Sequence, residues 1–231
     1  MAQSRINQGS GRRRFIGSLA VGAAGIGASI AAPLSLQANP IDSVTESDPE
    51  AIFSKLTGKH KMVFDATQPH GVFPFAWPRV FLMTNEMTGS PQKECNAIVV
   101  LRHDAIPYAM EDKLWEKYKF GEFFKADDPS TKARATRNPF AKPAAGEYKV
   151  PGIGPIALGI NELQASGVIF VVCDAAMTVY SAAMADSMKV DAAELKKEWV
   201  AGLLPGITPV PSGIWALGRA QEKGCAYVFT G

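Results

Sequence analysis

The sequence predicts an α/β domain in which helices cover both faces of a mostly parallel, five-stranded sheet, giving three layers. Short β-rich runs alternate with helical runs along the chain, which is the pattern of βαβ units. Two runs, 96–103 and 167–173, are almost wholly apolar, as is typical of strands buried on both faces. A composition of 47% hydrophobic and 20% charged residues over 231 positions excludes a wholly disordered chain.

Each element is justified by its own pattern. Apolar, β-branched runs predict strands at 60–67, 96–103, 167–173, 207–210 and 225–230. Helical patterns lie between them, at 73–87, 111–118, 160–166, 175–188, 191–203 and 212–223. Asp191 and Ser212 occupy N-cap positions, and Gly224 is a helix stop.

Two stretches lie outside this alternation. Residues 39–57 are polar and contain proline, so we expect a linker or a short first helix before a domain that spans 58–231. Residues 120–155 fit neither a helical nor a strand period and are expected to form an irregular insertion. Insertions of this length usually have a function.

The first 38 residues have the layout of an export signal. Residues 1–14 contain four arginines and no acidic residue. An apolar run, 15–36, follows them and ends in small residues. Arg12, Arg13, Phe15 and Ile16 match the pattern of the twin-arginine (Tat) signal, which this segment resembles. Cleavage after residue 31 and cleavage after residue 38 both fit.

The signal predicts a periplasmic or secreted protein that is handed to the Tat translocase. About twenty apolar residues are enough to span a bilayer, so an uncleaved signal would instead leave the protein anchored in a membrane. The glycines between Gly17 and Gly27 disfavour a stable helix there.

The charge of the chain divides at the signal. The whole chain carries a formal charge of +2. Without its first 38 residues it keeps 20 basic and 22 acidic residues, a balance of −2. This slightly acidic domain is not expected to bind nucleic acid.

Three stretches resemble the DsrE/DsrF-like family. Residues 167–176 (GVIFVVCDAA) match an apolar strand that ends in a cysteine before a small-residue helix start. Residues 97–105 (AIVVLRHDA) resemble the family's second strand, and 204–229 resemble its tail. The resemblance covers about 58–231 and implies a flavodoxin-like fold, often assembled as trimers or hexamers. The best-understood relatives relay sulfur between partner proteins as a cysteine persulfide.

Four residues are candidates for a site at the carboxyl ends of the strands, where open parallel sheets bind ligands. Cys173 ends a strand just before a helix start, which would stabilise the thiolate needed for persulfide chemistry. His70 and His103 follow the first and second strands, and Asp104 would orient the ring of His103. Arg102 would bind a sulfur oxyanion. The structural alternatives are a buried apolar thiol, a turn histidine and an interface arginine.

Three functions stay open at this point. The resemblance implies a thiol-based sulfur carrier or sulfurtransferase that uses Cys173 and exchanges sulfur with a relay or redox protein. The second is a metal- or cofactor-binding module built from Cys173, His70 and His103, although no HxxxH or CxxC spacing predicts a metal and no cofactor is indicated. The third is a non-enzymatic, oligomeric partner-binding protein. The chain is therefore not assigned as an enzyme.

No disulfide is expected among the three cysteines. Cys95 and Cys225 begin strands that would lie on or near opposite edges of a flavodoxin-like sheet, about 19 Å apart. A disulfide needs Cα atoms about 4.4–6.8 Å apart. Cys173 would lie at the opposite end of the sheet from both.

Overall fold

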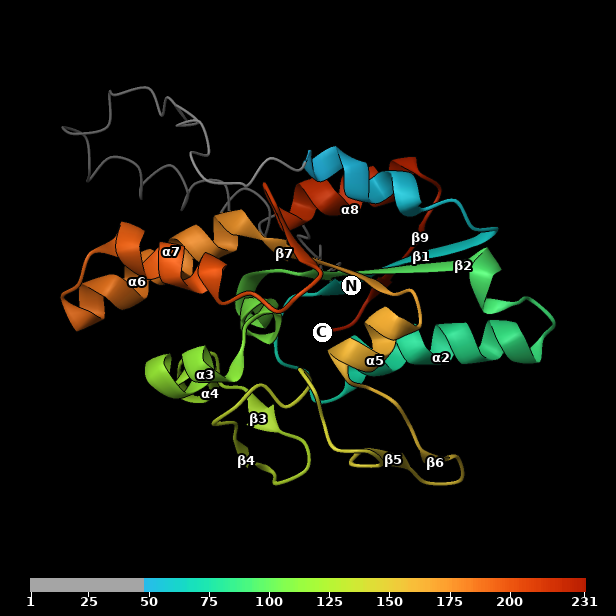
Figure 1. Ribbon diagram of the computed structural model, residues 1–231, viewed down its shortest axis with the longest axis horizontal. Helices are drawn as coiled ribbons and strands as arrows, with labels where there is room; N and C mark the ends of the chain where they lie inside the picture. The colour runs from blue at the N-terminus through green and yellow to red at the C-terminus, as the bar shows by residue number, and fades with distance from the viewer. Residues whose placement is uncertain (1–47) are drawn as a thin grey trace, which may run out of the picture. The chain divides into compact units, whose positions relative to one another are not determined.

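The computed structural model describes residues 48–231, so the predicted export signal lies outside the described residues. Five parallel strands form one sheet. They are β1 (His60–Ala66), β2 (Cys95–Leu101), β7 (Ile169–Cys173), β8 (Ile207–Val210) and β9 (Ala226–Phe229). Helices cover both faces of this sheet (Figure 1), which confirms the predicted three-layer, flavodoxin-like α/β class.

The strands lie in the order β8-β7-β2-β1-β9. The chain moves in one direction across the sheet from β1 to β8, and then returns to place β9 beyond β1. Right-handed crossovers put helices on one face during the first movement and on the opposite face during the return. The connections after β7 and β8 therefore leave to opposite faces, and the carboxyl ends of these two strands flank the switch point where open sheets bind ligands.

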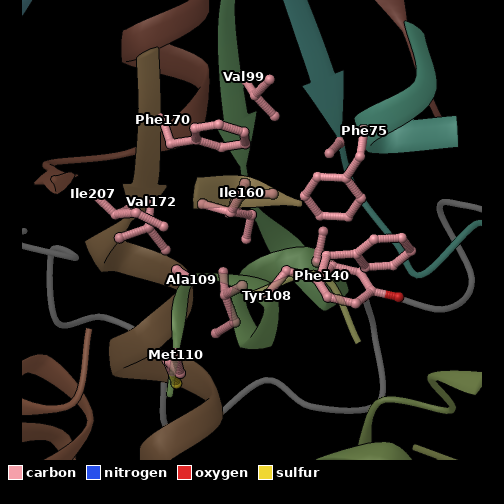
Figure 2. Packing of buried hydrophobic residues seen from close by; sticks show 14 of the residues in the cluster. Phe75, Val99, Tyr108, Ala109, Met110, Phe140, Ile160, Phe170, Val172 and Ile207 are labelled. Atoms are coloured by element: carbon pink, nitrogen blue, oxygen red, sulfur yellow. The ribbon is translucent and has the colours of Figure 1, made fainter. Parts of the chain in front are cut away.

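One face is covered by α2 (Phe73–Met87), α5 (Ile160–Ala165) and α6 (Asp174–Met188), with α7 (Ala192–Ala201) packed on α6. Aromatic side chains fill the core below the sheet, as Figure 2 shows. The rings of Phe75 and Phe140 stack with centroids 4.1 Å apart, and Tyr108 meets Phe75 edge-on at 5.3 Å. This core joins α2 to segments far apart in the sequence.

The other face is covered by η1 (Pro49–Lys55) and α8 (Gly213–Glu222), which lie side by side above the sheet in Figure 1. Ile52, Phe53 and Leu56 are buried in the core under these two elements. Of the two predictions for 39–57, a linker or a short first helix, the structure has the helix at Pro49–Lys55. Three apolar residues in a polar stretch were too few to decide between them, because only the surface beside α8 gives these residues a partner.

The insertion at 120–155 consists of short elements after α3 (Asp112–Tyr118). They are α4 (Phe120–Phe123) and two small hairpins, β3 (Asp127–Asp128) with β4 (Ala133–Arg134) and β5 (Lys149–Val150) with β6 (Gly154–Pro155). Asn138 anchors the segment, because its side-chain amide donates hydrogen bonds to Tyr108 O and Met110 O at 2.8 Å. The hairpins lie on the side of the sheet away from α8 (Figure 1).

Two shorter elements complete the domain. These are η2 (Gln92–Glu94), before β2, and η3 (His103–Ala109), after it. The predicted caps are present: Asp191 accepts a hydrogen bond from Glu194 N at 2.9 Å, and Ser212 accepts one from Trp215 N at 3.1 Å. In the part of the chain that is described, every helix is too short or too polar to cross a bilayer.

The strand order corrects one argument made from the sequence. β2 and β9 both neighbour β1, so Cys95 and Cys225 belong to strands two spacings apart, about 10 Å rather than about 19 Å. The last crossover returns across the sheet and adds β9 next to the first strand instead of extending the far edge. All three cysteines are buried, free thiols.

Candidate functional site

The carboxyl ends of β2 and β7 place Arg102 and Cys173 side by side. Leu101 pairs with Val172 in the parallel register, and Arg102 continues the ladder by donating its backbone N–H to Ala66 O at 3.0 Å. Arg102 and Cys173 are therefore the next residues in register, on strands about 4.8 Å apart. The Arg102 side chain packs against Gly213 at the start of α8, whereas Cys173 belongs to the core cluster on the α6 side.

Cys173 is both the last residue of β7 and the N-cap of α6. Its Sγ accepts a hydrogen bond from Ala176 N at 3.3 Å, and the side chain is almost fully buried, with 6% of the residue exposed. The sulfur therefore lies at the N-terminus of a 15-residue helix, where the helix dipole places partial positive charge. The predicted helix start beside the sulfur is thus confirmed.

Arg102 does not stand alone but belongs to an ion-pair cluster with Asp65 and Tyr227. Its Nε and Nη2 donate to the two carboxylate oxygens of Asp65 at 2.7 and 3.0 Å, a bidentate pair. The hydroxyl of Tyr227 donates to Oδ2 of Asp65 at 2.7 Å. Only 1% of the Asp65 side chain is exposed, so this carboxylate is buried and its oxygens are occupied.

The groups of the ion-pair cluster shift one another's pKa values. The hydrogen bond that Arg102 donates to Asp65 is the main cause that raises the pKa of Arg102, and the charges of Asp65, Tyr227 and Cys173 contribute less. Burial raises the pKa of Tyr227, and its hydrogen bond to Asp65 adds to the shift. Arg102 therefore stays a cation and Tyr227 a neutral donor over the physiological range.

The sequence reasoning missed Asp65 and Tyr227. A signal was present in the strand HKMVFDA, because an acidic residue inside an apolar strand needs a partner when it is buried. Arg102, at the end of the next strand, was the available cation. Tyr227 carried no such signal, since an aromatic residue in a strand is ordinary.

Gly213, the first residue of α8, makes room for Arg102. A Cβ built on Gly213 would lie 2.6 Å from Cβ and 2.7 Å from Cδ of Arg102, which is far inside contact distance. The start of α8 thus rests directly on the aliphatic part of this arginine. Ala175 N also donates to Pro211 O at 3.2 Å, so the helix starts that follow β7 and β8 are joined.

His103 follows Arg102 in the chain, but its side chain contacts Asp104 and not the ion-pair cluster. Its backbone is left-handed, with φ of 51°, and 62% of its side chain is exposed. Its Nδ1 is 3.4 Å from Oδ1 of Asp104, the predicted partner. The same oxygen accepts a hydrogen bond from Tyr180 of α6. His103 is therefore tied to the start of η3 and to α6.

His70 lies on the other side of the cluster, in the loop after β1. It is exposed, and its Nδ1 is 3.3 Å from Thr230 O, just after β9. Its ring lies 5.1 Å from that of Phe73. Arg102 and Cys173 thus lie at the ends of neighbouring strands, whereas His70 lies beside β9 and His103 lies beside α6.

No group of three or more His, Cys, Asp and Glu side chains in residues 48–231 is arranged to hold a metal ion. The three-residue metal site considered from the sequence, Cys173 with both histidines, does not form within this part of the chain. The reason is topological: β9, which leads to the His70 contact, lies three strands from β7.

The substrate-sized cavities lie elsewhere. One of about 460 Å³ lies between α3 and α7, and another of about 510 Å³ lies beside the hairpin of β5 and β6. Cys173 lines neither of them.

No family model matches the chain, and no curated protein shows significant similarity to it. Among solved structures, a protein of unknown function, MTH1491 from Methanobacterium thermoautotrophicum, aligns with 74% of this chain and 98% of its own. The two share 16% identity at a TM-score of 0.33. The likeness is too distant to identify a family or a function.

Proposed function

We propose that the protein is a thiol-based sulfur carrier that holds sulfane sulfur as a persulfide on Cys173. The observation that carries this proposal is the position of the sulfur, which accepts the Ala176 N–H at the start of α6 and lies in register with Arg102. Reactive cysteines commonly lie at helix N-termini, and the thiolate is the nucleophile in sulfur transfer.

The reaction is an exchange without net oxidation. The Cys173 thiolate attacks the terminal sulfur of a donor persulfide, R–S–SH. A sulfur–sulfur bond forms to Cys173, the bond within the donor breaks, and the donor leaves as the thiolate R–S⁻. The same step in reverse, toward an acceptor thiolate, unloads the carrier.

The other two cysteines are poorer candidates for this chemistry. Burial raises the pKa of Cys95, and the charge of Glu94 adds to the shift. Burial also raises the pKa of Cys225, against a smaller effect of Lys61. Both lie at the amino ends of their strands, away from the helix starts that favour a thiolate.

The setting of this function follows from the sequence. The Tat-like signal supports export, so the carrier would work in the periplasm or outside the cell, with a sulfur-relay or redox protein as donor. The DsrE-like pattern supports a homo-oligomer, a trimer or hexamer. Membership of that family is part of the same proposal.

The test is to load the full chain with glutathione persulfide and map the added sulfur by mass spectrometry. We expect one extra sulfur atom on Cys173 and its removal by a thiol reductant. Cys173→Ser keeps an oxygen that can cap α6 and should take up no sulfur, whereas the matched variant Cys225→Ser should load like the wild type. Unmodified Cys173, with the protein folded, would overturn the proposal.

A second function is favoured by the burial of Cys173, whose sulfur also caps a helix. In that case the cysteine is structural and the domain binds a partner without chemistry. Loading at Cys173 would contradict this alternative, because a purely structural thiol has no need to react.

A further inference from the structure

We propose that two copies of this chain pair through β9, antiparallel across a two-fold axis, so that their five-stranded sheets join into one continuous sheet. This interface is independent of the carrier function, because it concerns how two copies meet and not what Cys173 does. A two-fold axis occurs in dimers and in hexamers but not in trimers. The interface therefore also selects between the two assemblies named above.

The first support is a set of unpaired backbone groups on the outer edge of β9. Thr230 N donates to Asp65 O at 2.9 Å, so Thr230 and, by alternation, Val228 bond to β1. Alternate residues of a strand bond to opposite sides, so the N–H and C=O groups of Tyr227 and Phe229 point away from β1. These groups have no partner among residues 48–231. Each of the two residues thus leaves one donor and one acceptor free at the sheet edge.

The spacing of these free groups is self-complementary. When a two-fold axis passes through Val228 and two copies of β9 lie antiparallel, Tyr227 of each copy faces Phe229 of the other. Each such pair exchanges both N–H···O=C bonds, and the two aromatic rings meet as a cross-strand pair. A shift by two residues in either direction would bring in Cys225 or Gly231, whose backbone groups already have partners within the domain. The free groups therefore favour a single register.

The two edges of the sheet also differ in how they are protected. The strand at the other edge, β8, contains Pro209, which has no N–H, and it contacts η1. By contrast, β9 (AYVF) contains neither proline nor a charged residue, the features that commonly keep an edge strand from pairing. Beside it, Asp65 and Arg102 neutralise each other. Two copies can therefore meet at β9 without repulsion between like charges.

The last support is the exposed aromatic surface around β9. Four aromatic side chains there are 39 to 56% exposed: Phe73, Trp77, Tyr227 and Phe229. Phe73 and Trp77 stack on each other at the start of α2. His70 contacts Phe73 and Thr230, and thus joins this part of α2 to the end of β9. The exposed parts of the four side chains amount to about 350 Å² per copy, nearly half of the roughly 800 Å² that each partner buries in a stable interface.

The first experiment tests the register by cross-linking in the full chain. Val228→Cys places one thiol of each copy at the two-fold axis, in a non-hydrogen-bonded pair whose Cα atoms lie about 4.5 Å apart, within disulfide reach. After mild oxidation with diamide we expect a covalent dimer, in which mass spectrometry finds the two introduced thiols linked to each other. The matched variant Thr208→Cys, on the other edge strand, should give no covalent dimer.

The second experiment measures the mass of the assembly by sedimentation equilibrium. Phe229→Lys places a charge on the edge of β9 and keeps the bonds to β1. We expect the mass to fall to half that of the wild type. Phe123→Lys, a matched change at an exposed aromatic residue of α4, should leave the mass unchanged.

Three results would overturn the interface. They are a monomeric or trimeric wild type, equal effects of Phe229→Lys and Phe123→Lys on the mass, and a folded Val228→Cys variant that forms no covalent dimer.

The interface and the carrier function fail separately. If the wild type takes up no sulfur from glutathione persulfide but the Val228→Cys dimer forms, the carrier function is wrong and the interface stands. If sulfur loads on Cys173 of a wild type that is monomeric, the interface is wrong and the carrier function stands.

Discussion

The cysteines at the two ends of the parallel sheet have different surroundings. At the amino end, Cys95 and Cys225 are buried at strand starts, and burial raises the pKa of both thiols. At the carboxyl end, Cys173 is equally buried but accepts a helix N–H and lies next to a held arginine. Burial alone thus does not make a thiol inert or reactive. We expect the direction of the neighbouring backbone dipoles and charges to decide which thiol reacts.

The ion-pair cluster is where this difference has the largest expected effect on stability. Arg102→Gln leaves the carboxylate of Asp65 buried without its cation, so we expect a loss of about 3–5 kcal/mol in the free energy of unfolding. Urea denaturation measures it. Adding Asp65→Asn should recover most of the loss, and failure to recover it would show that the arginine acts through packing instead.

The contact between α8 and Arg102 gives the next largest effect. Gly213→Ala should cost about 1–3 kcal/mol, because the new methyl group overlaps the arginine side chain. Gly218→Ala, within the same helix and in open space, should instead stabilise the protein by up to about 1 kcal/mol. Changes of opposite sign in the free energy of unfolding, measured by thermal or urea denaturation, would show that the carboxyl end of the sheet is tightly packed around Arg102. Equal effects would contradict it.

The cap formed by Cys173 gives a smaller effect. Cys173→Ala removes the acceptor for Ala176 N and should cost about 1 kcal/mol, whereas Cys173→Ser supplies a better N-cap and should be close to neutral. The difference between the two variants in urea unfolding isolates the hydrogen bond. If both cost the same, the sulfur contributes by packing and not as a cap.

The smallest predicted effect is a difference in thiol reactivity between the cysteines at the two ends of the sheet. Since the pKa values of Cys95 and Cys225 are raised, both thiols keep their protons to higher pH than an ordinary cysteine. Near neutral pH we expect alkylation at Cys173 first, and at the other two after the pH rises. Mass spectrometry after short exposure to iodoacetamide gives the order. Labelling of Cys225 before Cys173 would contradict the expected difference between the two ends of the sheet.

The elements of the fold were predictable because each depends on local pattern. The strand at 60–67, the helix at 73–87 and the caps at Asp191 and Ser212 are present where propensity and spacing place them. The first 3₁₀ helix was only one of two expectations for its stretch, because Ile52 and Phe53 are apolar residues among polar ones and their packing partner, α8, lies far away in the sequence.

The candidate site was predictable in part. Cys173 and Arg102 were found because both follow apolar strands, and carboxyl ends of parallel strands share one edge. Asp65 and Tyr227 were missed because their roles depend on which strands are neighbours. That same order places the strands that start near Cys95 and Cys225 on either side of β1, where the sequence suggested distant edges.

By itself, the sequence determined the alternation of strands and helices, which predicts a mostly parallel sheet, and the cysteine at a helix start, since both patterns depend on residues close together in the chain. The tertiary structure alone decided that β9 lies beside β1, that a buried carboxylate holds Arg102, and that the two histidines have different partners, Thr230 for His70 and Asp104 for His103. The physical reason is that burial and ion pairing depend on spatial neighbours, which only the crossovers between strands select.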